Sequence, residues 1–303
     1  MQRHPLGRGA EWSMMSRKLF AGRYWFFEDT PKLGEPSSAI WAVLPEKDLY
    51  SGTSSFQEIE VFDTEEYGRV LALDGLVQLS TNHEFIYHEM LVHPAMLYHG
   101  NPKKVLIVGG GDGGTLREVL KHPVEEVLLV EIDKQVIEVC RAYLPMVASG
   151  AFEDERVSIR FADAADVLPT FHGRFDLVIN DCTDPYGPST ELWEGAFFTH
   201  VREALCEGGV ASFQTGFFSE TFARRSRKLL RQIFPSTILH RAYVRCFPSD
   251  ECSFTIASAG VALREIPLAL IRERYASLNL QTRYYSPDIH FASSLLPGYI
   301  DET

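Results

Sequence analysis

The chain has 303 residues, of which 45% are hydrophobic and 23% are charged, a composition typical of a folded protein with a substantial core. Its net charge of −12 repels phosphate backbones, which argues against nucleic acid as a partner. The sequence has neither an apolar run long enough to span a membrane nor a signal peptide, so we expect a cytoplasmic protein with no membrane partner. Its five cysteines are widely spaced and contain no C-x-x-C, so we expect free thiols and no metal site.

The first 82 residues are predicted to form an extension and a small antiparallel β domain. Met14-Met15 follows a polar leader that contains glycine, so we expect residues 1–14 to be an upstream start or an added extension. Strands are predicted where short segments are rich in β-branched and aromatic residues, at 23–27, 56–62 and 69–73. Asp74-Gly75 favours a tight two-residue hairpin turn. We therefore place the β domain at residues 15–82.

From Glu84 the apolar spacing becomes helical, although Pro94 is expected to kink or end the helix. Apolar segments of strand length follow at 105–108, 127–130, 157–161, 177–179 and 210–213. Amphipathic stretches at 112–121, 134–143 and 219–234 predict helices between or after them. This alternation predicts an α/β fold for residues 83–303, with a doubly wound and mostly parallel sheet.

The segment GGGDGG at residues 109–114 follows a predicted strand and precedes a predicted helix, which is the setting of a glycine-rich ligand loop. Glycines such as Gly109 and Gly111 let the backbone approach a bound molecule, and the helix start offers free N–H groups. Glu131 ends the next strand, where an acid accepts hydrogen bonds from ribose hydroxyls. Asp112 stands where a dinucleotide would place its pyrophosphate. Because a carboxylate there attracts a cation, the loop favours a nucleoside with a positive appendage, such as a sulfonium, over NAD or ATP.

Further acids follow strands at the same predicted sheet edge. Asp163 fits either a hydrogen bond to an adenine amino group or a helix N-cap. Asp181 and Asp184 lie in a loop with two prolines at the carboxyl end of a strand, where open α/β sheets bind ligands. A carboxylate in that position can accept the proton of an amine that attacks carbon. A plain turn capped by aspartate is the alternative.

Several motifs occur in an order that resembles spermidine synthase and the polyamine aminopropyltransferase family, from about residue 51 to about residue 254. They are residues 57–62, 73–75, Gln78, 84–90, 109–114, 131–133 and 181–185. The resemblance implies a β domain on a Rossmann-like domain and a homodimer or homotetramer. It implies transfer of an aminopropyl group from the co-substrate decarboxylated S-adenosylmethionine to a di- or polyamine such as putrescine, with release of methylthioadenosine and no prosthetic group.

The resemblance also implies roles for individual residues. Asp181 would be the proton-accepting catalytic base, with Tyr87 beside it and Asp184 as the amine anchor. Asp112 would hold the aminopropyl ammonium, and Glu131 would bind the ribose. Also expected are contacts to the nucleoside from Gly109, Gly111, Asp163 and Ala164, and contacts to the substrate from Gln57, Gln78, His88, Gln214, Phe247 and Glu251.

The chain departs from the family at residues 245–252, where RCFPSDEC replaces a Pro-Thr-Tyr-Pro-Ser-Gly segment. Phe247 lacks the tyrosine hydroxyl, and Asp250 and Glu251 add two acids. We therefore expect an amine that is longer than putrescine or carries a further cation. Two other functions stay open: an S-adenosylmethionine-dependent N-methyltransferase, which uses the same sheet, glycine loop and ribose acid, and a non-catalytic nucleoside- or polyamine-binding protein.

Overall fold

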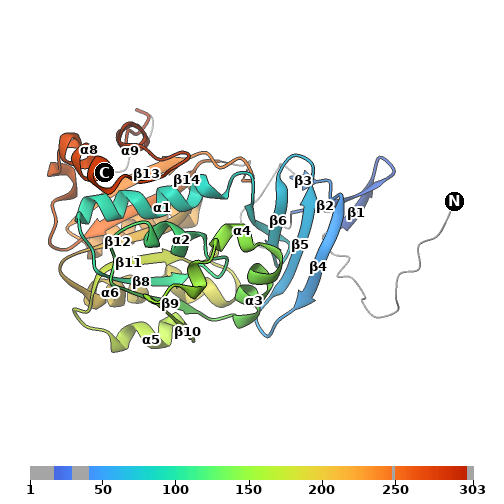
Figure 1. The fold of residues 1–303 in the computed structure, drawn as a ribbon, viewed down its shortest axis with the longest axis horizontal. Coiled ribbons are helices and arrows are strands. Elements are labelled where there is room, and N and C mark those ends of the chain that lie inside the picture. Colours follow the sequence, from blue (N-terminus) through green and yellow to red (C-terminus); the bar gives the residue numbers. More distant parts are fainter. Residues whose placement is uncertain (1–16, 29–40, 248–249, 299–303) are drawn as a thin grey trace.

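The computed structural model describes residues 17–28, 41–247 and 250–298, so the predicted extension at residues 1–14 lies outside the described residues. Antiparallel strands stand at one end of a larger α/β body (Figure 1). No described helix is both long and apolar enough to cross a membrane. All five cysteines are unpaired, as the sequence predicted.

Two small antiparallel sheets form the N-terminal part. One contains β1 (Arg17–Phe20), β2 (Arg23–Phe27) and β3 (Ala42–Val43), and the other contains β4 (Lys47–Thr53), β5 (Glu58–Thr64), β6 (Gly68–Leu73) and β7 (Leu76–Ser80). The predicted turn joins β6 to β7, and Asp74 and Gly75 both have the positive φ that such a turn requires, 50° and 77°. The sequence missed β1, β3 and β4 because these strands are short or largely exposed and lack a clear apolar alternation.

The α/β body is built on a seven-stranded sheet. Its strands are β8 (Lys104–Gly109), β9 (Glu126–Glu131), β10 (Val157–Phe161), β11 (Phe175–Asp181), β12 (Leu205–Phe217), β13 (Ser236–Ala242) and β14 (Cys252–Ser258). Their order is β10-β9-β8-β11-β12-β14-β13, and β14 runs antiparallel to the other six strands. The mostly parallel sheet confirms the predicted fold class. The prediction missed β13 and β14, whose polar residues interrupt the apolar pattern.

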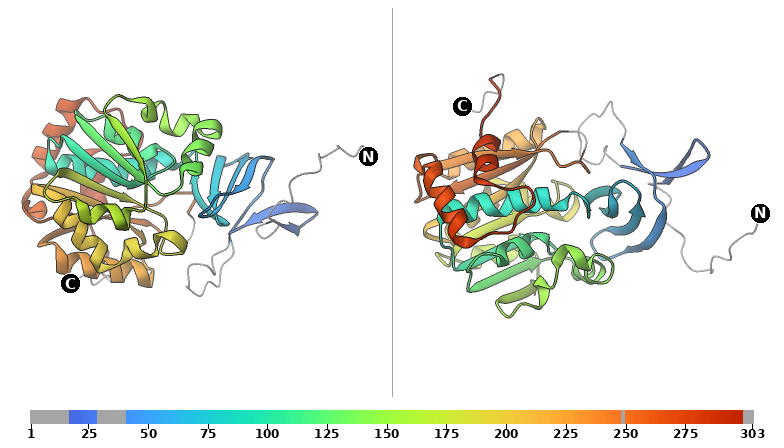
Figure 2. Two further views of the ribbon diagram at one scale, coloured as in Figure 1. Left: turned by 90° about the horizontal axis from the view of Figure 1, so that it is seen from below. Right: turned by 45° about the horizontal axis from the view of Figure 1, so that its top comes forward.

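Helices cover both faces of this sheet (Figure 2). Ile107 and Ile179 pack in one core cluster with α1 (Glu84–His99) and α2 (Gly114–Leu120). The alternate residues Val108 and Val178 pack in a second cluster with α6 (Gly195–Ala204) and α7 (Thr221–Ile233). Since both faces are buried at the centre of the sheet, the strands β8, β9 and β11 are almost continuously apolar.

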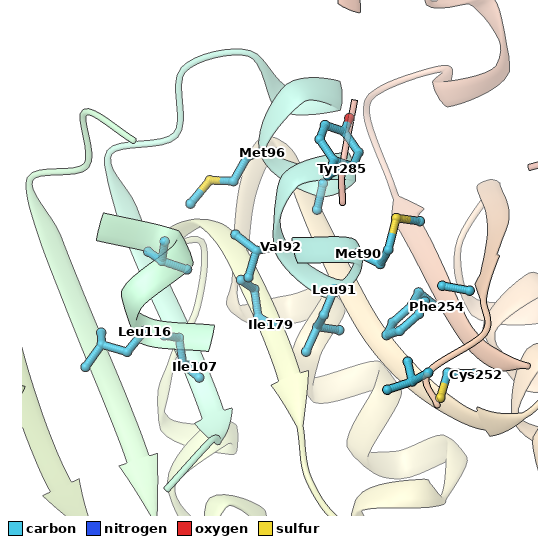
Figure 3. Packing of buried hydrophobic residues seen from close by; sticks show 14 of the residues in the cluster. Met90, Leu91, Val92, Met96, Ile107, Leu116, Ile179, Cys252, Phe254 and Tyr285 are labelled. Carbon is cyan, nitrogen blue, oxygen red and sulfur yellow. The ribbon is translucent and has the colours of Figure 1, made fainter. Parts of the chain in front are cut away.

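Helix α1 organises the first cluster. Its residues Leu91, Val92 and Met96 lie over Ile107 and Ile179 (Figure 3). The helix does not end at Pro94 but continues to His99. The C-terminal helices α8 (Leu268–Leu278) and α9 (Pro287–Ser293) complete this side, with α8 in contact with α1.

The N-terminal sheet packs on the α/β body through α3 (Lys134–Tyr143) and α4 (Pro145–Ala148). Ile59, Val61 and Leu71 of the sheet share a buried cluster with Val136 and Val147. The predicted bounds of α3 agree with the structure because the helix is strongly amphipathic and Asp133 caps its first turn. This packing places β5–β7 opposite the carboxyl ends of the parallel strands.

Candidate active site

A cleft lies between β5–β7 of the N-terminal sheet and the carboxyl edge of the seven-stranded sheet. Every predicted site residue except Glu251 lines it: Gln57, Gln78, Tyr87, His88, Gly109, Gly111, Asp112, Glu131, Asp163, Ala164, Asp181, Asp184, Gln214 and Phe247. The residues gather there because parallel strands end at one edge and the loops that follow them meet.

The glycine loop is held against the end of β11. Gly109 and Gly110 have φ values of 77° and 73°, and the Gly110 N–H donates to the carbonyl oxygen of Asp181 at 3.0 Å. A Cβ atom on Gly109 would overlap that same carbonyl oxygen. Glycine at position 109 therefore allows the loop to approach the backbone of Asp181.

Glu131 and Asp163 lie on the nucleoside side that the sequence predicted. The Oε1 atom of Glu131 accepts a hydrogen bond from the Asp133 N–H at 2.9 Å, and burial raises the pKa of Glu131 to about 7. The Oδ1 atom of Asp163 accepts from the Ala165 N–H at 2.8 Å and caps α5 (Ala164–Val167). Asp163 is thus the helix N-cap that the sequence allowed, and it also lines the cleft.

Asp112 is paired with a histidine that is itself held from behind. Its Oδ1 atom accepts from the Gly114 N–H at 2.6 Å and lies 3.4 Å from Nε2 of His88. On the other side, His88 Nδ1 lies 2.6 Å from Glu84 Oε2, and Arg117 binds both oxygens of Glu84. Burial favours neutral His88, but the Asp112 and Glu84 carboxylates outweigh it and raise the His88 pKa to about 10. An imidazolium therefore faces Asp112 at neutral pH.

Both carboxylate oxygens of Asp181 accept hydrogen bonds from hydroxyl groups. The Tyr87 hydroxyl donates to Oδ1 at 2.8 Å, and the Thr115 hydroxyl donates to Oδ2 at 2.7 Å. Desolvation and the negative charge of Asp112 raise the pKa of Asp181. A carboxylate oxygen of Asp112 and one of Asp181 lie within 4.8 Å of each other, so two acids face the same part of the cleft. The arrangement can bind a positive group and accept a proton beside it.

The far end of the cleft contains further acids. Asp184 accepts from Gln214 Nε2 at 3.1 Å, and desolvation raises the Asp184 pKa to about 6. Glu28, which sequence reasoning missed, follows β2 and accepts from the Val77 N–H at 3.0 Å. Desolvation raises the Glu28 pKa to about 7. An acid directly after an aromatic strand was the available signal, but it is too common to identify a site by itself.

The segment that departs from the family contributes less to the cleft than predicted. Phe247 lines the cleft, with its ring centroid 6.4 Å from that of Tyr87. Glu251 is not among the described lining residues, because its carboxylate pairs with Arg241. Asp250 accepts from the Ser219 N–H at 2.8 Å. In this structure Glu251 is therefore engaged by Arg241 away from the cleft, and its contact with the amine stays a prediction.

The sequence of this chain is similar to that of known protein families and enzymes. A family described as spermine/spermidine synthase domain matches residues 84–265, and one described as spermidine synthase tetramerisation domain matches residues 24–81. The polyamine aminopropyltransferase of Pectobacterium carotovorum subsp. carotovorum is 40% identical over 255 residues, which cover 83% of this chain and 89% of that protein. The enzyme of the same name from Shouchella clausii is 40% identical over 257 residues, 84% of this chain and 91% of that protein.

Two solved structures of spermidine synthases are also similar to this chain. The crystal structure of a spermidine synthase in complex with the transition-state analogue AdoDATO has a TM-score of 0.84 and 37% identity, covering 91% of this chain and 92% of the other. Spermidine synthase from Thermotoga maritima has a TM-score of 0.81 and 35% identity with the same coverage. The likeness therefore extends over both the N-terminal sheets and the α/β body.

Proposed function

The chain belongs to the spermine/spermidine synthase family, and on this premise we propose that it transfers the aminopropyl group of decarboxylated S-adenosylmethionine to a di- or polyamine such as putrescine. The observation that carries the proposal is the position of Asp181. It shares one cleft with the carboxylate of Asp112, which lies near it, and with two further acids, Asp184 and Glu28. A sulfonium substrate with a terminal ammonium fits the site at Asp112, and an amine fits the site at Asp184 and Glu28.

The proposed reaction is a direct displacement. Asp181 accepts a proton from the ammonium form of the substrate, because only the neutral nitrogen has a lone pair for attack. That nitrogen forms a bond to the methylene carbon next to the sulfonium as the carbon–sulfur bond breaks, and methylthioadenosine leaves with the electron pair. The product nitrogen keeps its two hydrogens as a secondary ammonium, and Asp181 returns its proton to solvent. Catalysis consists mostly of positioning and charge placement.

The nucleoside is proposed to lie over the glycine loop, with Glu131 on the ribose and Asp163 near the adenine. Gly109, Gly111 and Ala164 line that end of the cleft. Asp112, paired with His88, would hold the aminopropyl ammonium. No prosthetic group is needed for this displacement.

The distal ammonium of the amine is proposed to lie between Asp184 and Glu28. Gln78 donates a hydrogen bond to the Tyr186 hydroxyl at 3.2 Å, and Gln214 donates one to Asp184. The two side-chain amides therefore hold Tyr186 and Asp184 in position at the amine end of the cleft. Since Asp184 and Glu28 have pKa values raised to about 6 and about 7, both gain negative charge as the pH rises through this range. Amine binding should tighten over the same interval.

We also propose that the chain forms a homodimer or homotetramer and divides into domains near residue 82. Support for an oligomer comes from the match to a tetramerisation domain. It also comes from the exposed apolar side chains Leu19, Phe20 and Tyr24 on the β1–β2 hairpin.

The test is a product assay. The protein is incubated separately with decarboxylated and with intact S-adenosylmethionine, each with putrescine, cadaverine, agmatine, spermidine and shorter diamines, and the products are identified by mass spectrometry. We expect methylthioadenosine and an aminopropylated amine, with decarboxylated S-adenosylmethionine alone. S-adenosylhomocysteine and a methylated amine would show an N-methyltransferase instead. Binding without either product would show a non-catalytic binding protein.

A further inference from the structure

We infer that Thr115 is a positioning residue, whose hydroxyl holds the carboxylate of Asp181 in place for proton transfer. Thr115 lies in the first turn of α2 and is fully buried. It is not among the described residues that line the cleft, so it touches the reaction only through Asp181. The inference rests on the proposed function, in which Asp181 is the base.

The two hydroxyl donors approach Asp181 from different sides. Tyr87 donates to Oδ1, and its ring packs edge-on against Phe247 and Phe254 on the amine side. Thr115 donates to Oδ2 from the glycine-loop side, where a Cβ atom on Gly110 would lie 3.1 Å from the same oxygen. Rotation of the carboxylate would break at least one of these bonds. Oδ2 is therefore held by α2 and Oδ1 by α1, and Oδ1 is the oxygen on the amine side.

The Thr115 hydrogen bond also acts on the charge of Asp181. The titratable groups around this carboxylate include Tyr87 and His88 on α1, Asp112 in the glycine loop, Glu131 at the end of β9 and Cys182, which follows Asp181 in the chain. Asp112 and desolvation favour the protonated form of Asp181, whereas the hydroxyl of Thr115 stabilises the carboxylate form. Because threonine does not titrate, removing its hydroxyl changes the pKa of Asp181 without adding or removing a charge. The base would then be protonated at a higher pH.

Position 115 offers a matched pair of variants. Thr115→Val keeps the branched shape in a site without free volume and removes the donor, whereas Thr115→Ser keeps the donor and removes a methyl group. A role in packing alone predicts that valine is the milder change. A role in positioning the base predicts that serine is the milder change.

The experiment measures kcat and kcat/KM against pH for the wild type, Thr115→Val and Thr115→Ser, with decarboxylated S-adenosylmethionine and the amine that the product assay identifies. For Thr115→Val we expect the acid limb of the kcat profile to move up by about 0.5–1 pH unit, the size that one lost hydrogen bond gives. The acid limb of kcat/KM also contains the titration of Asp184 and Glu28, so it is the kcat profile that reports on Asp181. On that limb kcat should fall about threefold to tenfold and recover as the pH rises. Thr115→Ser should follow the wild type, and KM for the nucleoside should not change.

An acid limb of kcat at the same pH in Thr115→Val and the wild type would overturn the inference. So would an equal loss of kcat at every pH, which is the signature of a packing defect. If Thr115→Val does not fold, Thr115→Ala takes its place, since it also lacks the donor.

A second measurement separates this inference from the proposed function. If the wild type forms no aminopropylated product with any amine, the proposed function fails. The protonated carboxyl of Asp181 is then followed by difference infrared spectroscopy, with Asp181→Asn used to identify its band. A protonation midpoint raised in Thr115→Val but not in Thr115→Ser would support the hydrogen-bond role without any activity. Equal midpoints would refute it.

Discussion

Asp181 combines a carboxylate at the end of β11 with donors from two helices, and asparagine at this position keeps the shape while it removes the base. We expect Asp181→Asn to lower kcat by on the order of 100-fold or more, because the amine then loses its proton acceptor. Binding of methylthioadenosine, measured by calorimetry, should stay close to that of the wild type. The exposed Asp166→Asn in α5 is the control. Equal losses of turnover and nucleoside binding would contradict the assignment of the base.

Glu28 gives a prediction about the other end of the cleft. Glu28→Gln should raise KM for the amine about tenfold, since a lost charged contact costs roughly 1.4 kcal/mol or more, and should leave kcat largely unchanged. The wild-type KM should fall as the pH rises from 6 to 8, and this dependence should weaken in the variant because the pKa of Glu28 is raised to about 7. Steady-state kinetics across this range test both statements. A variant with unchanged KM and the same pH dependence would remove Glu28 from the amine site.

Gly109 tests the close approach of the glycine loop to β11. Gly109→Ala places a Cβ atom against the backbone of Asp181 and also strains a backbone with φ of 77°. Gly150→Ala is the matched control, because its φ is 84° and nothing lies within 4 Å of the added Cβ atom. We expect the Gly109 variant to lose about 1–3 kcal/mol more unfolding free energy than the Gly150 variant in urea titrations, from the steric clash. Equal losses would mean that the loop moves away at no cost.

Residues that belong to a local pattern could be predicted from the sequence, and residues that act through distant contacts could not. Asp112, Glu131 and Asp181 each follow a strand in a recognisable setting, and the structure places them in one cleft. Thr115 is an ordinary helix residue in the sequence, and its partner Asp181 is 66 positions away. The ion pair between Glu251 and Arg241 could not be predicted either, because nothing in the sequence indicates that these two residues meet.

Among the elements, α1 connects the cleft to the C-terminal segment. Glu89, buried on α1 two residues from Tyr87, accepts hydrogen bonds from the backbone N–H groups of Arg283, Tyr284 and Tyr285 at 2.8, 2.8 and 2.7 Å. One carboxylate therefore holds the chain between α8 and α9. Such a contact between residues almost 200 positions apart leaves no local signal, which is why the sequence located α1 but not its role in anchoring the C-terminal segment.

Glu89→Ala should leave three backbone donors without their partner. We expect a loss on the order of 3 kcal/mol in unfolding free energy, about 1 kcal/mol for each donor. Hydrogen exchange should accelerate at residues 283–293 before it changes at the glycine loop. The exposed Glu273→Ala on α8 is the control. Slow exchange in this segment of the Glu89 variant would show that side-chain packing alone fixes it.

At the scale of the whole molecule, the site depends on segments that only the tertiary fold brings together. The alternation of strands and helices was enough to predict the sheet and the edge at which its acids gather. The opposite wall, with Gln78 and Glu28, comes from the N-terminal sheets, whose docking onto α3 and α4 buries a separate apolar cluster. Local patterns carry no information on that docking angle, so the amine end of the cleft was the least predictable part.

The same tertiary packing buries histidines away from the cleft. His240 lies between Tyr98 and Ser293, at 3.2 and 2.8 Å from their hydroxyl oxygens. His290 Nδ1 lies 2.7 Å from the Tyr285 hydroxyl, and His122 Nε2 lies 2.9 Å from His93 Nδ1. Burial lowers the pKa of His290 to about 4, that of His122 to about 3 and that of His240 well below its usual range.

Each of these three histidines makes a contribution to stability that is lost in mild acid. Below pH 6.5 the unfolded chain takes up a proton that the folded chain excludes, so each histidine lowers the unfolding free energy by about 2 kcal/mol between pH 7 and 5. The raised pKa values of Glu28, Glu131 and Asp184 act in the opposite direction over the same interval, so the contribution of one histidine is read from the difference between a variant and the wild type. His88 acts in the opposite sense, because its pKa is raised to about 10 and its contribution is lost only as the pH rises toward that value. Urea titrations at pH 7 and 5 and at fixed protein concentration measure the difference.

His290→Asn should reduce the decrease in unfolding free energy between pH 7 and 5 by about 2 kcal/mol, whereas the exposed His172→Gln should leave this decrease unchanged. If His290→Asn lost as much stability between pH 7 and 5 as the wild type, His290 would not be neutral in the folded protein.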